Sequence, residues 1–154
     1  MSDKARITTI ETEMTNFKAP QNELFVPVSY GEVADKITIL EIKSERISDP
    51  DKLANITKEL TALRAHFYGH LGALPDSYDA LNGRLKAINE ELWQIEDDIR
   101  DCERDQNFGP AFVSLARAVY FTNDKRAQIK REINLLLGSA YVEEKSYQDY
   151  APHS

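Results

Sequence analysis

The chain has 154 residues, of which 42% are hydrophobic and 29% are charged, so it is long enough to bury a core and too apolar to be globally disordered. Its net charge of −7 repels nucleic acid phosphates, which disfavours nonspecific nucleic acid binding. No apolar run reaches about 18 residues, so we expect neither a signal peptide nor a membrane-spanning helix. Because Cys102 is the single cysteine, we expect a reducing compartment and assign the chain to the cytoplasm.

Two amphipathic helices are predicted in the first half of the chain. Residues 29–32 form a capping box, in which the side chains of Ser and Glu satisfy amides at the start of the first helix. Asp49 caps the second helix, Pro50 occupies its first position, and Gly69 and Gly72 end it. Apolar residues recur mainly at three- and four-residue spacing along both helices: Val33, Ile37, Leu40 and Ile47, then Leu53, Ile56, Leu60, Leu63 and Phe67.

The second half predicts two longer helices. The first spans about residues 77–104, which corresponds to roughly 40 Å of helix. Residues 107–109 interrupt the apolar spacing, and the second helix spans about residues 110–137 with Gly138 as its C-cap. Residues 122–124 favour helix caps over helix interiors, so a kink is expected to be tolerated there.

These elements predict an all-α fold, namely a four-helix bundle-like domain with a long antiparallel helical hairpin and flexible termini. The hairpin follows from the short connection between the last two helices. We expect residues 1–23 to form a poorly ordered N-terminal tail, residues 24–138 the helical domain, and residues 139–154 a C-terminal tail. The sustained heptad-like spacing also fits a coiled-coil homodimer.

Polar residues lie on the face that the 110–137 helix should bury. Winding this helix at about 100° per residue places Asn123, Arg126 and Lys130 in line with the apolar residues Phe112 and Val119. A buried charge without a partner is costly, so these groups need counter-charges or water.

The other helices offer partners for these cations. Folding the hairpin brings Arg126 close to Asn89, with Glu96 one turn further along. The remaining polar candidates lie along the edges of the 77–104 helix and of the first helix: Arg100, Lys36, Glu41 and Lys43.

Two interpretations of this cluster stay open. It could be a pocket for an anionic or sugar-like small molecule, in which Arg126 and Lys130 hold negative charge, Asn89 and Asn123 orient the ligand, and Glu41 or Glu96 acts as a base. It could instead be a structural ion-pair network that fixes the register of the helices. The structural interpretation is favoured, because such networks bring the same residue types together.

We predict no metal site and no cofactor. His66 and His70 have metal-like spacing, but the Glu of a zinc-protease motif is missing and a glycine lies between them. The sequence also lacks a Glu-x-x-His motif, a P-loop and a glycine-rich dinucleotide motif.

Several longer segments resemble a family of small bacterial and phage proteins known as a domain of unknown function. The resemblance covers roughly residues 25–147. It is carried by residues 25–32 (FVPVSYGE), 35–43 (DKITILEIK), 92–93 (LW), 95–100 (IEDDIR), 122–126 (TNDKR) and 143–147 (EEKSY). The resemblance implies that these segments belong to the family's signature, and it implies no activity, substrate or catalytic residue.

The sequence therefore predicts a helical binding or assembly module, with a second copy as partner through the long hairpin. The alternative is an enzyme or ligand-binding protein that holds an anionic or sugar-like small molecule between the first, third and fourth helices. Neither interpretation involves nucleic acid or a membrane.

Overall fold

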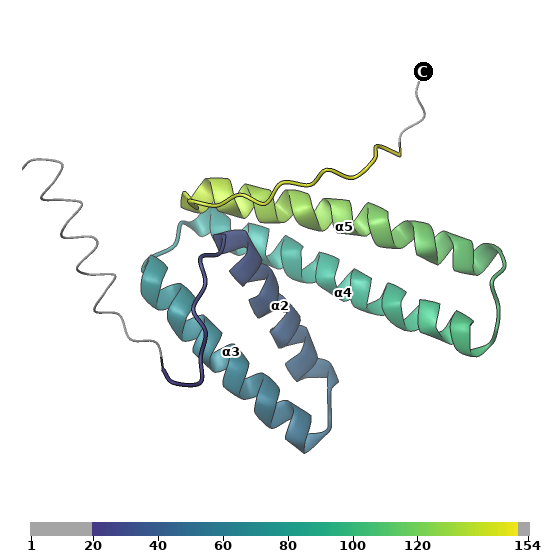
Figure 1. Ribbon diagram of the computed structural model, residues 1–154, viewed down its shortest axis with the longest axis horizontal. Helices are drawn as coiled ribbons and strands as arrows, with labels where there is room; N and C mark the ends of the chain where they lie inside the picture. Colours follow the sequence, from purple (N-terminus) through teal and green to yellow (C-terminus); the bar gives the residue numbers. More distant parts are fainter. Residues whose placement is uncertain (1–19, 151–154) are drawn as a thin grey trace, which may run out of the picture.

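The computed structural model describes residues 20–150, and this part of the chain contains four α-helices and no strand (Figure 1). They are α2 (Tyr30–Arg46), α3 (Pro50–Leu71), α4 (Asp76–Arg104) and α5 (Pro110–Leu137). The predicted all-α, bundle-like fold is confirmed. Most of the predicted N-terminal tail lies outside the described residues.

The helix ends follow the predicted capping signals. The Ser29 hydroxyl accepts a hydrogen bond from the amide of Glu32 at 3.2 Å, and the Asp49 carboxylate accepts one from the amide of Lys52 at 2.9 Å. Gly138 ends α5 with φ of 69°, a left-handed conformation that costs glycine little. The predicted weak point at residues 122–124 does not interrupt α5, which is helical throughout this stretch.

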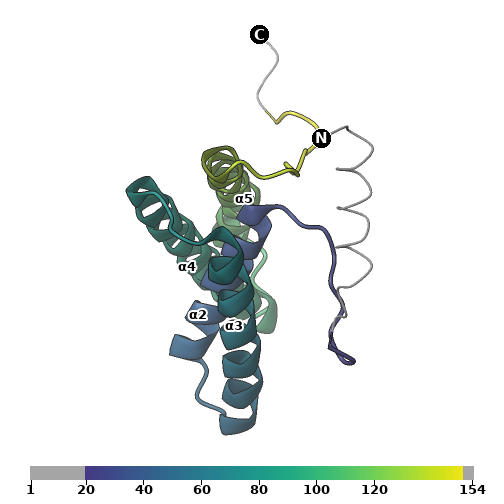
Figure 2. The same ribbon diagram turned by 90° about the vertical axis from the view of Figure 1, so that its left-hand side faces the viewer.

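The two long helices form an antiparallel hairpin, and α2 packs against both of them (Figure 1). Helix α3 packs against α2, and Figure 2 shows α2 and α3 together on one side of the hairpin. The core lies where α2 meets the hairpin, because apolar stripes from all helices converge there. Its buried side chains include Ile37, Leu40, Phe67, Tyr78, Leu85, Ile129 and Ile133.

The hairpin continues past the end of α2 as a two-helix arm, which we define as residues 94–121 (Figure 1). At the C-terminal end of α2, the guanidinium of Arg46 lies 5.6 Å from the ring centre of Trp93 on α4. The apolar residues that join the two helices of the arm are mostly only half-buried: Ile99, Cys102, Phe112, Leu115 and Val119.

After α5, residues 139–150 run back along α5 without secondary structure, on the side away from α4 (Figures 1 and 2). We call this segment the strap. Its Ser139 hydroxyl accepts a hydrogen bond from the amide of Tyr30 at 3.2 Å, so the strap begins at the N-terminal end of α2.

Candidate functional site

One side of α5 carries four polar residues at a spacing of four, which places them in a single row facing α2 and α4. We call this row the polar seam; it consists of Thr122, Arg126, Lys130 and Asn134. Thr122, Lys130 and Asn134 are buried, and Arg126 is half-buried. Each of the four side chains contacts α2, α4 or both.

At one end of the seam, the backbone of α2 touches α5 directly. The amide of Gly31 donates a hydrogen bond of 2.6 Å to the side-chain oxygen of Asn134. A Cβ atom at Gly31 would press against the backbone oxygen of Lys130 and would lie 3.0 Å from the Asn134 oxygen. Glycine is therefore required here by close approach of the two helices.

Lys130 is the most buried cation of the seam, with 8% of its surface exposed. Its ammonium lies 2.6 Å from a carboxylate oxygen of Glu32 on α2 and 3.0 Å from one of Glu143 in the strap. Burial tends to lower the pKa of Lys130, but hydrogen bonds to both glutamates raise it, and the net shift is upward. The hydrogen bond to Lys130 in turn lowers the pKa of Glu143. Lys130 therefore links α5 to α2 and to the strap through two ion pairs.

We expect Glu143→Gln to lower the free energy of unfolding by at most about 1 kcal/mol at neutral pH, because Glu143 is nearly half exposed. The lowered pKa means that this carboxylate contributes stability above its usual pKa of 4.5 and loses the contribution as the pH falls through the lowered value. The raised pKa of Lys130 means that its contribution is complete below the usual value of 10.5 and is lost as the pH rises through the raised value.

The difference between parent and Glu143→Gln should therefore be constant from about pH 5 to pH 10 and shrink in acid. Urea unfolding curves over a pH series measure it. A difference of the same size at about pH 2 would contradict the assignment of this contact.

Asn89 of α4 contacts the middle of the seam through Arg126. Its side-chain amide donates to a carboxylate oxygen of Asp35 at 2.8 Å and to the hydroxyl of Thr38 at 2.9 Å, and all three residues are buried. Its carbonyl oxygen accepts a longer bond of 3.4 Å from the guanidinium of Arg126. One α4 residue therefore connects α2 with α5, as the folded hairpin predicts for Arg126 and Asn89.

At the Thr122 end of the seam, the polar side chains are less completely hydrogen-bonded. The Thr122 hydroxyl donates to a carboxylate oxygen of Glu91 at 3.4 Å. Among the described residues, the buried side-chain oxygen of the neighbouring Asn123 is without a hydrogen-bond partner. Asn123 lies on α5, close to the point at which the hairpin continues as a two-helix arm.

The structure places the other predicted candidates away from the seam. Glu41 pairs with Arg64 of α3, so it does not face the cations of α5. Lys36 pairs with Glu59 of α3 at 2.7 Å, and Glu96 pairs with Arg100 of its own helix at 2.6 Å. Lys43 is half-buried on α2, where its backbone oxygen accepts the N–H of the helix cap.

Seven residues of the network were not among the sequence candidates: Glu32, Asp35, Thr38, Glu91, Thr122, Asn134 and Glu143. For Asn134 a signal was present, because it follows Lys130 by four residues and so shares its helix face. Whether Asp35 and Thr38 face the hairpin depends on the rotation of α2 about its axis. Because α2 has apolar residues on two sides, its sequence does not define that rotation. Glu143 comes from a segment without helical spacing.

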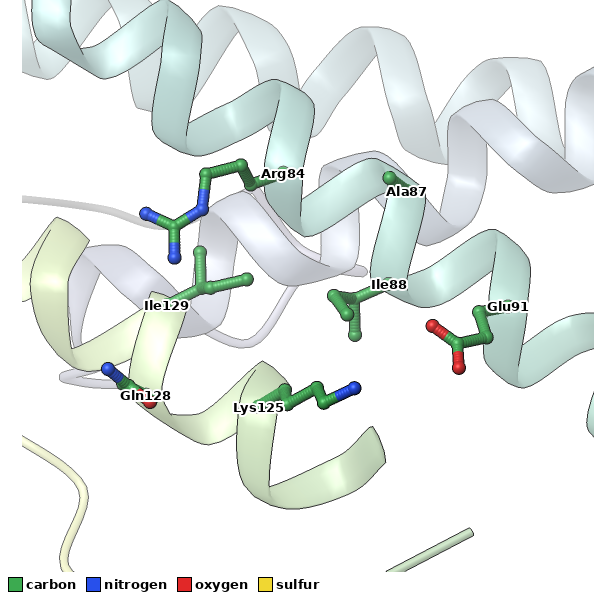
Figure 3. Close-up of a pocket in the computed structure, with 7 residues that line it drawn as sticks. All are labelled: Arg84, Ala87, Ile88, Glu91, Lys125, Gln128 and Ile129. Carbon is green, nitrogen blue, oxygen red and sulfur yellow. The ribbon is translucent and has the colours of Figure 1, made fainter. Parts of the chain in front are cut away.

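Two surface grooves lie near this network, but neither is lined by Arg126 or Lys130. The smaller, of about 300 Å³, lies between α4 and α5 with Ile88 and Ile129 between the charged side chains of Arg84, Glu91 and Lys125 (Figure 3). The larger, of about 900 Å³, lies between α2, α3 and residues 23–28. The cations of the seam are therefore used within the fold.

The described part of the chain holds no cluster of three His, Cys, Asp or Glu side chains that could bind a metal ion. Within residues 20–150 no helix is long and apolar enough to cross a membrane.

The helices and the seam define an all-α protein of the bundle-like class, with a polar network between α2 and the hairpin. The chain belongs to the family described as "Family of unknown function (DUF6165)", whose sequence model matches residues 24–153. Neither the comparison with curated proteins nor that with solved structures gives a match.

Proposed function

We propose that this protein is a helical assembly module in which two copies associate through the arm. The observation that carries the proposal is the incomplete burial of the arm. The body of the hairpin buries Leu85, Ile129 and Ile133 beneath α2, whereas Phe112, Leu115 and Val119 of the arm stay half-buried. Two helices alone cannot enclose a core, and a stable bundle encloses its apolar positions with further helices.

The distribution of side chains on the arm favours contact through α5. Three large apolar side chains of the arm are exposed: Phe108, Val113 and Tyr120, at 48%, 52% and 41%. The α4 side of the arm is acidic, with Glu96, Asp97, Asp98, Asp101 and Glu103. Two α4 helices would repel one another, so we infer that the α5 helices meet across a twofold axis.

Sedimentation velocity over a concentration series tests this proposal. The parent chain should show a reversible dimer, and Val113→Lys should weaken it by about tenfold or more, because a desolvated ammonium would enter the interface. The matched control is Leu135→Lys, which changes another exposed apolar residue of the same helix, outside the arm. A parent chain that stays monomeric at about 100 μM, or equal weakening by both variants, would contradict the proposal.

The proposal includes a cytoplasmic location and a bacterial or phage origin. The single cysteine supports the location, and the resemblance of the quoted segments supports the origin. It also takes residues 24–138 as the helical domain, with tails on either side.

A further inference from the structure

The strap is held to α5 by two neighbouring acidic residues. Glu143 lies 3.0 Å from the ammonium of Lys130, and Glu144 lies 3.2 Å from the guanidinium of Arg131. Lys130 is also satisfied by Glu32 of α2, whereas Arg131 has a single ion pair, to Glu144, within the described residues. The basic pair on α5 thus matches an acidic pair in the strap.

A third contact, at the other end of the strap, is aromatic. The ring of Tyr150 lies 5.4 Å from that of Tyr120 and 4.8 Å from that of Phe121, with the second pair edge to face. From Arg131 to Phe121 the helix covers about 15 Å. From Glu144 to Tyr150 an extended chain covers up to about 20 Å, so the strap reaches both points without regular structure.

These contacts are specific in their chemistry but weak individually. The side chain of Glu144 is 80% exposed and Tyr150 is 53% exposed, so the strap buries little of its own surface. Exposed ion pairs and exposed aromatic pairs each add little to stability, because solvent screens the charges and little surface is buried. A segment held in this way detaches and rebinds readily, which leaves the underlying surface open for part of the time.

We propose that this face of α5 is a binding surface for an acidic peptide segment of another polypeptide. The segment would carry two adjacent carboxylates followed six residues later by a tyrosine, as Glu144 and Tyr150 are spaced in the strap. The strap occupies the surface in cis and competes with the partner. The surface consists of Lys130 and Arg131 at one end and Tyr120 and Phe121 at the other. Its cationic and aromatic ends, about 15 Å apart, fit an extended peptide better than a compact anion.

The probe for this proposal is a fluorescein-labelled peptide with the sequence of residues 139–150, added to the full-length chain. The strap covers the surface in some of the molecules. The apparent affinity of the probe is therefore its intrinsic affinity multiplied by the fraction of molecules whose surface is open. A full-length chain with Glu143→Gln, Glu144→Gln and Tyr150→Ala, here termed the released chain, should therefore bind the probe about tenfold more tightly than the parent, measured by fluorescence anisotropy. The three side chains are at least 45% exposed, so the fold should be retained.

Two further variants of the released chain identify the surface. Arg131→Glu should abolish probe binding, whereas Lys125→Glu, which reverses an exposed cation of α5 at the groove shared with α4, should leave it unchanged. A probe in which both glutamates are replaced by glutamine should not bind. The proposal is overturned if the released chain binds no better than the parent, or if Arg131→Glu and Lys125→Glu behave alike. Because Tyr120 belongs both to the arm and to this surface, the anisotropy measurements are repeated in chains that also carry Val113→Lys, which keeps these outcomes separate from the fate of the arm-mediated dimer.

Discussion

Replacing Gly31 with alanine is expected to lower the free energy of unfolding by about 2–3 kcal/mol, because the added methyl group meets the backbone of α5 rather than a flexible side chain. Relief of the contact requires α2 to move away, which also lengthens the hydrogen bond from Gly31 to Asn134. Urea unfolding monitored by circular dichroism measures the change.

The matched control is Gly83→Ala, at an exposed position inside α4 where nothing lies within 4 Å of the added atom. Alanine is favoured over glycine in a helix by about 1 kcal/mol, so this variant should be more stable than the parent. The same substitution in two helices is thus expected to have opposite signs. A stabilised Gly31→Ala variant would show that α2 and α5 are not in close contact.

Asn89→Leu should lower the free energy of unfolding by about 3 kcal/mol, because it leaves the buried carboxylate of Asp35 without its amide donor. The hydroxyl of Thr38 and the guanidinium of Arg126 lose a partner at the same time. Thermal and urea unfolding at neutral pH give the loss in stability.

Two comparisons distinguish the loss of the hydrogen-bond network from the effect of changing the shape of one side chain. Asn82→Leu, at a half-buried position on the same helix, removes only an acceptor 3.5 Å from the Tyr78 hydroxyl and should cost less than about 1 kcal/mol. Adding Asp35→Asn to Asn89→Leu removes the unpaired charge and should recover part of the loss. Equal losses for Asn82→Leu and Asn89→Leu would show that the buried amide has no special role.

The helices could be predicted from the sequence because their signals are local. The bond from the Glu32 amide to Ser29, the cap at Asp49 and the left-handed Gly138 each involve residues only a few positions apart. The inward direction of Lys130 also follows from the phase of a single helix. Such features need no knowledge of how one helix is placed against another.

The partners of the seam could not be predicted in the same way. Glu41 and Glu96 were plausible counter-charges for Lys130, but the counter-charges in the structure are Glu32 and Glu143. The choice depends on the position of α2 along α5 and on an irregular segment that returns along the helix. Both are set by tertiary packing, which spacing within one helix does not report.

The contacts between α2 and α5 connect parts of the chain that are far apart in sequence. The bond between Gly31 and Asn134 spans 103 positions, and the pair of Glu32 and Lys130 spans 98. The α4–α5 hairpin, by contrast, needs only a short turn, and its closure carries a much smaller entropy penalty. We therefore expect the hairpin to form early during folding and α2 to dock late, so that the strength of the seam governs mainly the rate of unfolding and thus the lifetime of the native state.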